Sequence, residues 1–231
     1  MLRKIIFTAT LLTGTALAGL SPGSASAAPA PTPAIPKGFL LHDREVAREQ
    51  AAKHTPADGE NVWRASAKVG ERFVADPCAN SAVAASQRKD PKIGQADRAV
   101  ARTIYFSTRE EVETAEQVIL YRSERAAQSA LRQFQAAVQK CRQSEGWKNG
   151  SFSRSLARVA LGDEAWKSSA RDYEDGRPVA GDDTVIVRRA NAVIVYLASG
   201  TSQPAAQSHT RQLAHARQML AKVCQIAACA P

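Results

Sequence analysis

The sequence lacks the short motifs that mark the common metal- and cofactor-dependent enzymes. H-E-x-x-H, the Walker phosphate loop, G-x-G-x-x-G and G-x-S-x-G are all absent, and each of these patterns works because its spacing brings ligands or phosphate-binding amides together. Histidine is scarce, and the four histidines are His42, His54, His209 and His215. The last two lie six residues apart on one expected helix, off the i, i+4 spacing of a shared metal. We therefore expect no catalytic residue, no metal site and no cofactor.

Long apolar segments are also rare, and the one that occurs lies at the N-terminus. A short basic start precedes an apolar stretch over residues 5–20, and the sequence Ala25-Ser26-Ala27 follows. This order is typical of a secretory signal peptide, so we predict a signal over residues 1–27 that is cleaved after Ala27. A retained membrane anchor is the alternative, but the apolar stretch is shorter than the roughly 20 residues that a spanning helix needs.

The sequence also lacks the cysteine that would carry a lipid anchor. Leu20 stands where a bacterial lipobox has its lipidated cysteine, and without that thiol no thioether can form. No later segment is apolar enough to span a membrane. The protein is therefore expected to be secreted in soluble form, with no membrane span.

Acidic residues are fewer than basic ones, and the net charge is +9. Loss of the signal removes Arg3 and Lys4 and no acidic residue, which lowers the net charge from +9 to +7. The basic residues are spread along the chain and form no run interleaved with aromatics, so nucleic acid is not an expected partner. An anionic envelope component is a possible partner, although the same charge also serves solubility.

Cysteine is sparse, and the four cysteines are Cys78, Cys141, Cys224 and Cys229. An even number of cysteines in an exported chain predicts two disulfides. Of the three possible pairings we favour Cys78–Cys141 with Cys224–Cys229, because the second pair is close in sequence near the C-terminus. Zinc is the alternative, but the spacings do not fit a paired C-x2-C site and no histidine lies near Cys78 or Cys141.

The mature chain is predicted to contain an Ala/Pro-rich linker over residues 28–42 and a single domain over residues 43–231. The apolar patterns predict strands at 100–106, 114–121, 153–159, 165–173, 184–189 and 192–198. They predict helices at 44–54, at 124–141 after a capping Ser123, and at 205–223. Strands joined by short turns favour an antiparallel sheet packed against helices on one face, an α+β domain. A parallel α/β sheet is the alternative.

Side chains that could hold a ligand are few, since aromatic residues make up 6% of the chain. We select Trp147, Trp166 and Tyr173 as a stacking surface and Arg188 as a cation for an anionic group. Core packing of the aromatics and a solvated strand face for the arginine are the alternatives. Acidic residues between positions 163 and 183 could supply the two carboxylates of a glycosidase, although such residues usually form solvated turns.

Several segments carry a family resemblance. They are EQVILYRSERAAQSALRQFQAAVQKC (116–141), LGDEAW (161–166), VIVRRANAVIVYLASG (185–200) and the closing helix with its cysteines. Together they resemble the extracellular sensor domain of mycobacterial PknH-type receptor kinases, which also occurs in secreted and lipoprotein forms across actinobacteria. The resemblance implies an α+β domain with two disulfides and a cleft for a ligand. This sequence departs from the receptor kinases because it has no kinase domain and no transmembrane helix.

We therefore expect a secreted, non-enzymatic sensor or ligand-binding domain, monomeric, for a small molecule or a cell-envelope component. One alternative is a cell-wall or glycan hydrolase that uses acidic residues of the 163–183 region. The other is a secreted protein that binds or inhibits another protein. A deep cleft with two facing carboxylates would favour the hydrolase, a cleft without them would favour binding, and a flat sheet would favour protein interaction.

Overall fold

The computed structural model describes residues 34–52, 62–78, 92–107, 113–147, 150–200 and 207–229. The predicted signal peptide and the first part of the predicted linker lie outside these residues. The helices of the described part are α1 (Asp43–Ala51), α3 (Glu124–Lys140), α4 (Gln207–Val223) and the short 3-10 helix η1 (Gln95–Asp97). Its strands are β1 (Val62–Ser66), β2 (Arg98–Ser107), β3 (Glu113–Tyr121), β4 (Gln143–Trp147), β5 (Gly150–Val159), β6 (Glu164–Glu174), β7 (Arg177–Arg189) and β8 (Ala192–Gly200).

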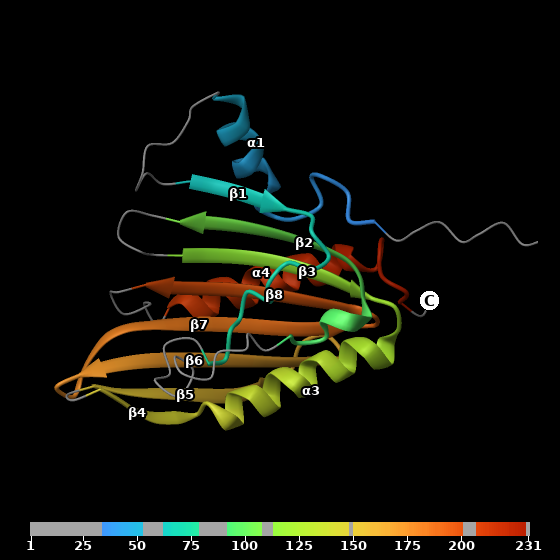
Figure 1. Cartoon of the computed structure of the whole chain (residues 1–231). Helices are drawn as coiled ribbons and strands as arrows, with labels where there is room; N and C mark the ends of the chain where they lie inside the picture. The colour runs from blue at the N-terminus through green and yellow to red at the C-terminus, as the bar shows by residue number, and fades with distance from the viewer. Residues whose placement is uncertain are drawn as a thin grey trace, which may run out of the picture. The chain divides into compact units, whose positions relative to one another are not determined.

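The strands of the described part form one eight-stranded sheet in the order β1-β2-β3-β8-β7-β6-β5-β4 (Figure 1). Every neighbouring pair in it is antiparallel. The first three strands make one meander, the last five make another, and the pairing of β3 with β8 joins the two. The predicted α+β domain, with an antiparallel sheet packed against helices, is confirmed.

Helices cover both faces of the sheet. Along β8, Ile194 and Tyr196 pack into the core that contains α4, whereas Val193 and Val195 pack into the core that contains α3. Figure 1 shows α3 in front of the strands and α4 behind them. The prediction of helices on one face is wrong, because β8 is buried at every position from Ala192 to Leu197 and such a strand needs cover on both sides.

Helix α3 begins and packs as its sequence predicts. The Oγ of Ser123 accepts a hydrogen bond from the backbone N of Ala126 at 3.1 Å, which caps the helix. Its buried side chains recur at helical spacing and face the sheet; they are Ala127, Ala130, Leu131, Phe134 and Val138. The helix ends at Lys140, next to Cys141.

Both predicted disulfides are present. Cys78 is bonded to Cys141, and Cys224 is bonded to Cys229. The first joins residues 63 positions apart and ties the segment before residue 78 to the end of α3, as the sequence predicted. Closing a loop of this length stabilises a fold by about 4 kcal/mol in the chain-entropy estimate.

The structure adds to the prediction at the sheet edges and in β7. The edge strands β1 and β4 were not predicted, because each is only five residues long and neither carries a run of apolar strand formers. β7 begins at Arg177, seven residues before the strand predicted at 184–189, because Asp182 and Asp183 are neutralised by arginines of neighbouring strands and can lie within the sheet. Phe39 and Leu40, which lie in the predicted linker, are buried in the core.

None of the helices in the described ranges has the length and apolar character needed to cross a membrane.

Candidate functional site

Arg188, predicted to bind an anion, is held by carboxylates of the protein itself. It lies on β7 with 7% of its surface exposed. Its Nη1 donates to Glu124 at 2.9 Å and to Asp163 at 3.3 Å, and its Nε lies 4.0 Å from a Glu164 oxygen. The guanidinium charge is compensated internally, and the cluster ties the start of α3 to the turn between β5 and β6.

The predicted aromatic residues lie at different places. Trp166 and Tyr173 both belong to β6 but sit near opposite ends of it. Trp166 packs against the α3-side core and donates its Nε1 to Glu164 at 3.1 Å. The backbone of Trp147 ends β4, and its side chain lies outside the described part. Trp166 and Arg188 thus meet at Glu164 while Tyr173 lies apart from them, and their role in ligand binding stays a prediction.

Carboxylates of the 163–183 region are engaged with neighbouring arginines. Asp182 accepts from Nη1 and Nη2 of Arg154 at 3.1 and 2.7 Å, in a buried bidentate pair. Asp183 is paired with Arg171 at 3.0 Å. These pairs cross-link β5, β6 and β7, so their immediate role is to neutralise charge within the sheet.

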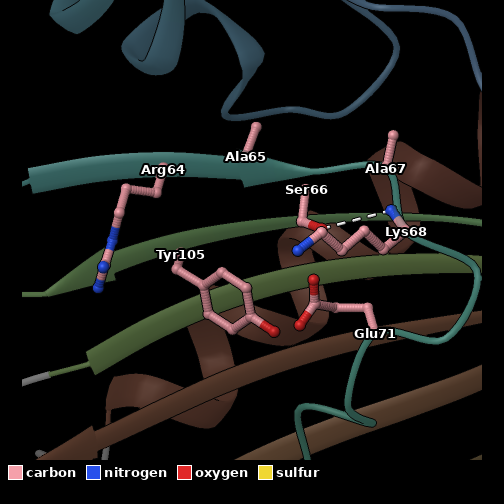
Figure 2. Close-up of a pocket in the computed structure, with 7 residues that line it drawn as sticks. All are labelled: Arg64, Ala65, Ser66, Ala67, Lys68, Glu71 and Tyr105. Carbon is pink, nitrogen blue, oxygen red and sulfur yellow. Dashed lines mark hydrogen bonds between the residues drawn. The ribbon is translucent and has the colours of Figure 1, made fainter.

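A groove opens at the β1–β2 edge of the sheet (Figure 2), with a volume of about 600 Å³. Its lining consists of Arg64, Ala65, Ser66, Ala67, Lys68, Glu71 and Tyr105. Arg64 on β1 is the direct register partner of Tyr105 on β2, so the two side chains project from the same face. That face is the one that α3 covers further along, since Ala101 of β2 belongs to the α3-side core. After Ser66 the chain leaves the sheet, and residues 67–71 form the wall of the groove.

Two exposed cations line this groove. Arg64 donates from Nη2 to the Ser107 hydroxyl at 3.4 Å, a contact to a neutral group. The Lys68 ammonium has no hydrogen-bond or ion-pair partner among the described residues, while its backbone N donates to Ser66 Oγ at 3.3 Å. Neither cation forms an ion pair with a carboxylate in the described part, so both can attract an anion into the concave surface.

Buried Arg98 fixes the wall from below. It begins β2, is 3% exposed, and donates to the carbonyl oxygens of Glu71, Val69 and Ile93. Its guanidinium also lies 5.9 Å from the centre of the Phe73 ring. A buried cation needs all of these partners, because leaving a buried charge unpaired is strongly destabilising. The wall is therefore held in one position.

A second anchor is Gln117 on β3, which is fully buried. Its Nε2 donates to the Arg72 carbonyl at 2.8 Å and to Thr103 Oγ1 at 2.9 Å, and its Oε1 accepts from the Val74 N at 3.2 Å. Beyond this point the Cys78–Cys141 disulfide closes the segment. The groove is thus built from fixed parts, and a pre-formed site loses less entropy on binding.

A smaller groove continues on the other side of Glu71, with a volume of about 230 Å³. It is lined by Gly70, Glu71, Arg72, Phe73, Lys92, Gln95 and Arg98. Arg72 is paired with Asp76 at 2.6 Å, whereas Lys92 is exposed. Glu71 lines both grooves, so this residue lies where the two grooves meet.

The opposite face of β1 is supported by stacked rings. Trp63 stacks on Phe106 with ring centres 4.5 Å apart and on His42 with centres 5.2 Å apart. The His42 ring also meets the edge of His215 on α4 at 5.1 Å. This stack holds β1, and with it Arg64, against the rest of the sheet.

Beneath the stack, a buried carboxylate gathers four donors. Glu116 accepts from the backbone N of Leu41, from the backbone N of His42 and from His42 Nδ1, each at 3.0 Å, and from Tyr196 Oη at 2.8 Å. Burial, with the nearby Glu116 charge, raises the pKa of the Tyr196 phenol well above its ordinary value. Burial, with the nearby His42, lowers the pKa of His215. These groups fasten the segment before α1 to the sheet.

The chain matches no protein-family model, and no curated protein matches it. Among solved structures it is similar to the extracellular domain of PknH from Mycobacterium tuberculosis, with a TM-score of 0.50 and 9% sequence identity. The match covers 80% of this chain and 94% of that domain. This is a distant likeness of fold and not membership of a family. It agrees with the fold that the sequence resemblance implied.

The groove residues were not predicted from the sequence. They come from β1 and from residues 67–71, which lack the strong apolar pattern of the central strands. The available signal was a short alternation in the sequence of β1. Trp63 lies on the face that packs, whereas the polar side chains of Arg64 and Ser66 lie on the face toward solvent. No group of acidic, histidine and cysteine side chains within the described ranges is arranged to hold a metal ion.

Proposed function

We propose that this protein is a secreted, non-enzymatic binding protein whose β1–β2 groove holds a small anionic ligand. The observation that carries the proposal is a pair of exposed cations, Arg64 and Lys68, which form no ion pair with the described residues and line a groove of about 600 Å³. This volume lies within the usual range for small-molecule sites. The anchors at Arg98 and Gln117 support it, because they keep the site open before a ligand arrives.

Three further observations support this proposal. The two disulfides are typical of proteins that work outside a reducing cytosol. A solved structure with a similar fold is an extracellular domain. Asp182 and Asp183, which belong to the acidic region of the hydrolase alternative, are engaged with arginines of neighbouring strands and serve there to neutralise charge within the sheet.

The test is a binding screen on the chain from residue 28 onward, in which phosphate, sulfate, citrate and small carboxylates are titrated by calorimetry. We expect Lys68→Gln and Arg64→Gln each to weaken binding of a hit by about tenfold, since an ion contact in a partly dry site contributes 1–2 kcal/mol. The matched controls are Lys167→Gln and Arg158→Gln, which change exposed cations on β6 and β5.

The controls should bind as the unaltered protein does. Binding that survives both groove substitutions would contradict the proposal, as would a panel in which no anion binds at all.

A further inference from the structure

We infer that the ligand of the β1–β2 groove is a polyhydroxylated anion such as a sugar phosphate or a uronic acid, selected by Glu71. This rests on the proposed function and goes further, because it names the chemical class that the groove accepts. The basis is the position of one carboxylate among the cations of the site.

Glu71 does not neutralise either groove cation. In the described residues its side chain forms no ion pair with Arg64 or Lys68 and accepts no hydrogen bond. Figure 2 shows its carboxylate and the Tyr105 hydroxyl pointing toward one another within the groove. The site therefore presents acceptor oxygens as well as positive charge to whatever enters it.

An ionised carboxylate can only accept hydrogen bonds. A bare anion placed between Arg64 and Lys68 gains from both cations but is repelled by Glu71, and it offers that carboxylate no donor. A ligand that carries hydroxyl groups beside its anionic group satisfies all three side chains. Selection of this kind combines an attraction with a repulsion that acts on the wrong ligand.

A hydroxyl suits this position better than an ammonium group. An ammonium on the ligand would be repelled by Arg64 and Lys68, which line the same groove, whereas a hydroxyl carries no charge. The ring of Tyr105 adds a flat apolar surface with a polar tip, to which the C–H face of a sugar ring can pack.

The junction position of Glu71 strengthens the inference. Because Glu71 lines both grooves, a ligand that extends from Lys68 toward Lys92 has to pass its carboxylate. An extended ligand that carries hydroxyl groups at that point can continue into the second groove. A ligand with a negative charge at that point would be repelled by Glu71.

The experiment compares four probes by calorimetry: glucose 1-phosphate, glucuronate, inorganic phosphate and glucose. They are titrated into the unaltered protein, into Glu71→Gln and into the control Glu174→Gln, which changes an exposed glutamate on β6. We expect at least one of the two sugar anions to bind about tenfold more tightly than phosphate or glucose, as a charge-assisted hydrogen bond would provide.

Glu71→Gln should change the affinities for the sugar anion and for inorganic phosphate in opposite directions. The sugar anion should bind about five- to tenfold more weakly, because the charge-assisted acceptor is lost, while inorganic phosphate should bind several-fold more tightly, because the repulsion is lost. The control should change neither.

Failure of this inference can be distinguished from failure of the proposed function. If anions bind and Lys68→Gln weakens them, but Glu71→Gln changes all of them alike or not at all, selection by Glu71 is refuted and the groove remains the binding site. If none of the anionic probes binds in a way that depends on Lys68, both are refuted.

Discussion

The carboxylate of Glu116 lies against both the backbone and the side chain of His42. One oxygen of Glu116, Oε2, accepts from the His42 N and from His42 Nδ1, each at 3.0 Å. The glutamate side chain is completely inaccessible to solvent, and residues 116 and 42 belong to segments far apart in the chain. The segment before α1 is therefore fixed to the centre of the sheet by a charge that has no access to water.

Replacing this carboxylate should be costly. We expect Glu116→Gln to lower the free energy of unfolding by about 2–4 kcal/mol, because an amide places its N–H₂ against groups that already donate. Urea denaturation would measure the change. Glu174→Gln, at an exposed position, is the control and should change stability by less than about 0.5 kcal/mol; a similarly small effect at Glu116 would refute its role as an anchor.

The change of the fold's stability with pH should depend on His215. Burial, followed by the charge of His42, lowers its pKa, while Glu116 acts in the opposite direction and Arg211 in the same one. The unfolded chain then binds a proton at a higher pH than the folded chain, so the free energy of unfolding falls as the pH drops below about 6.5. His215→Gln should make the fall between about pH 7.5 and 5.5 smaller. An equal fall in both proteins would show that His215 is not the titrating group.

Two glycines with positive φ should respond differently to alanine. At Gly162, with φ +58°, a Cβ would lie 2.6 Å from the Arg188 carbonyl oxygen, whereas at Gly176, with φ +74°, it would meet nothing within 4 Å. We expect Gly162→Ala to destabilise the protein by about 2–4 kcal/mol, since clash adds to backbone strain. Gly176→Ala should cost only about 1 kcal/mol. Thermal unfolding of both variants would test this, and equal losses would contradict it.

The two disulfides should contribute unequally. Removing Cys78–Cys141, which spans 63 residues, is expected to cost about 4 kcal/mol, and removing Cys224–Cys229, which spans five, about 2 kcal/mol. Paired cysteine-to-serine variants compared by chemical denaturation would measure both. Anion binding should weaken in the first variant only, because that disulfide closes the segment that forms the groove wall. Equal effects on binding would show that the wall does not need this link.

The central part of the fold could be predicted from the sequence because its helix cap and apolar patterns are local and strong. Ser123 and the apolar spacing of the helix after it predicted α3, and the apolar runs around residues 184–198 predicted β7 and β8. The cysteine count and spacing gave the correct disulfide pairing. For this helix and these two strands, neighbouring residues alone carry enough information to fix the element.

The candidate site was not accessible in the same way. Arg188 looked like a free cation because its partners, Glu124 and Asp163, are far from it in sequence. Lys68 gave no signal because its lack of a partner is a property of the folded arrangement. Charge compensation is decided by tertiary contacts, so a sequence pattern cannot separate a buried cross-link from a cation that faces a groove.

The pairing of β3 with β8 has a consequence for the order of events during synthesis. β3 ends at Tyr121, and its partner begins only at Ala192, so the N-terminal meander is left with an unpaired edge until most of the chain has been made. Contacts of such long range form slowly, because a large loop must be closed first. The full sheet therefore cannot be completed until most of the chain has been synthesised. A polypeptide that must be threaded through a membrane before it folds would benefit from that delay.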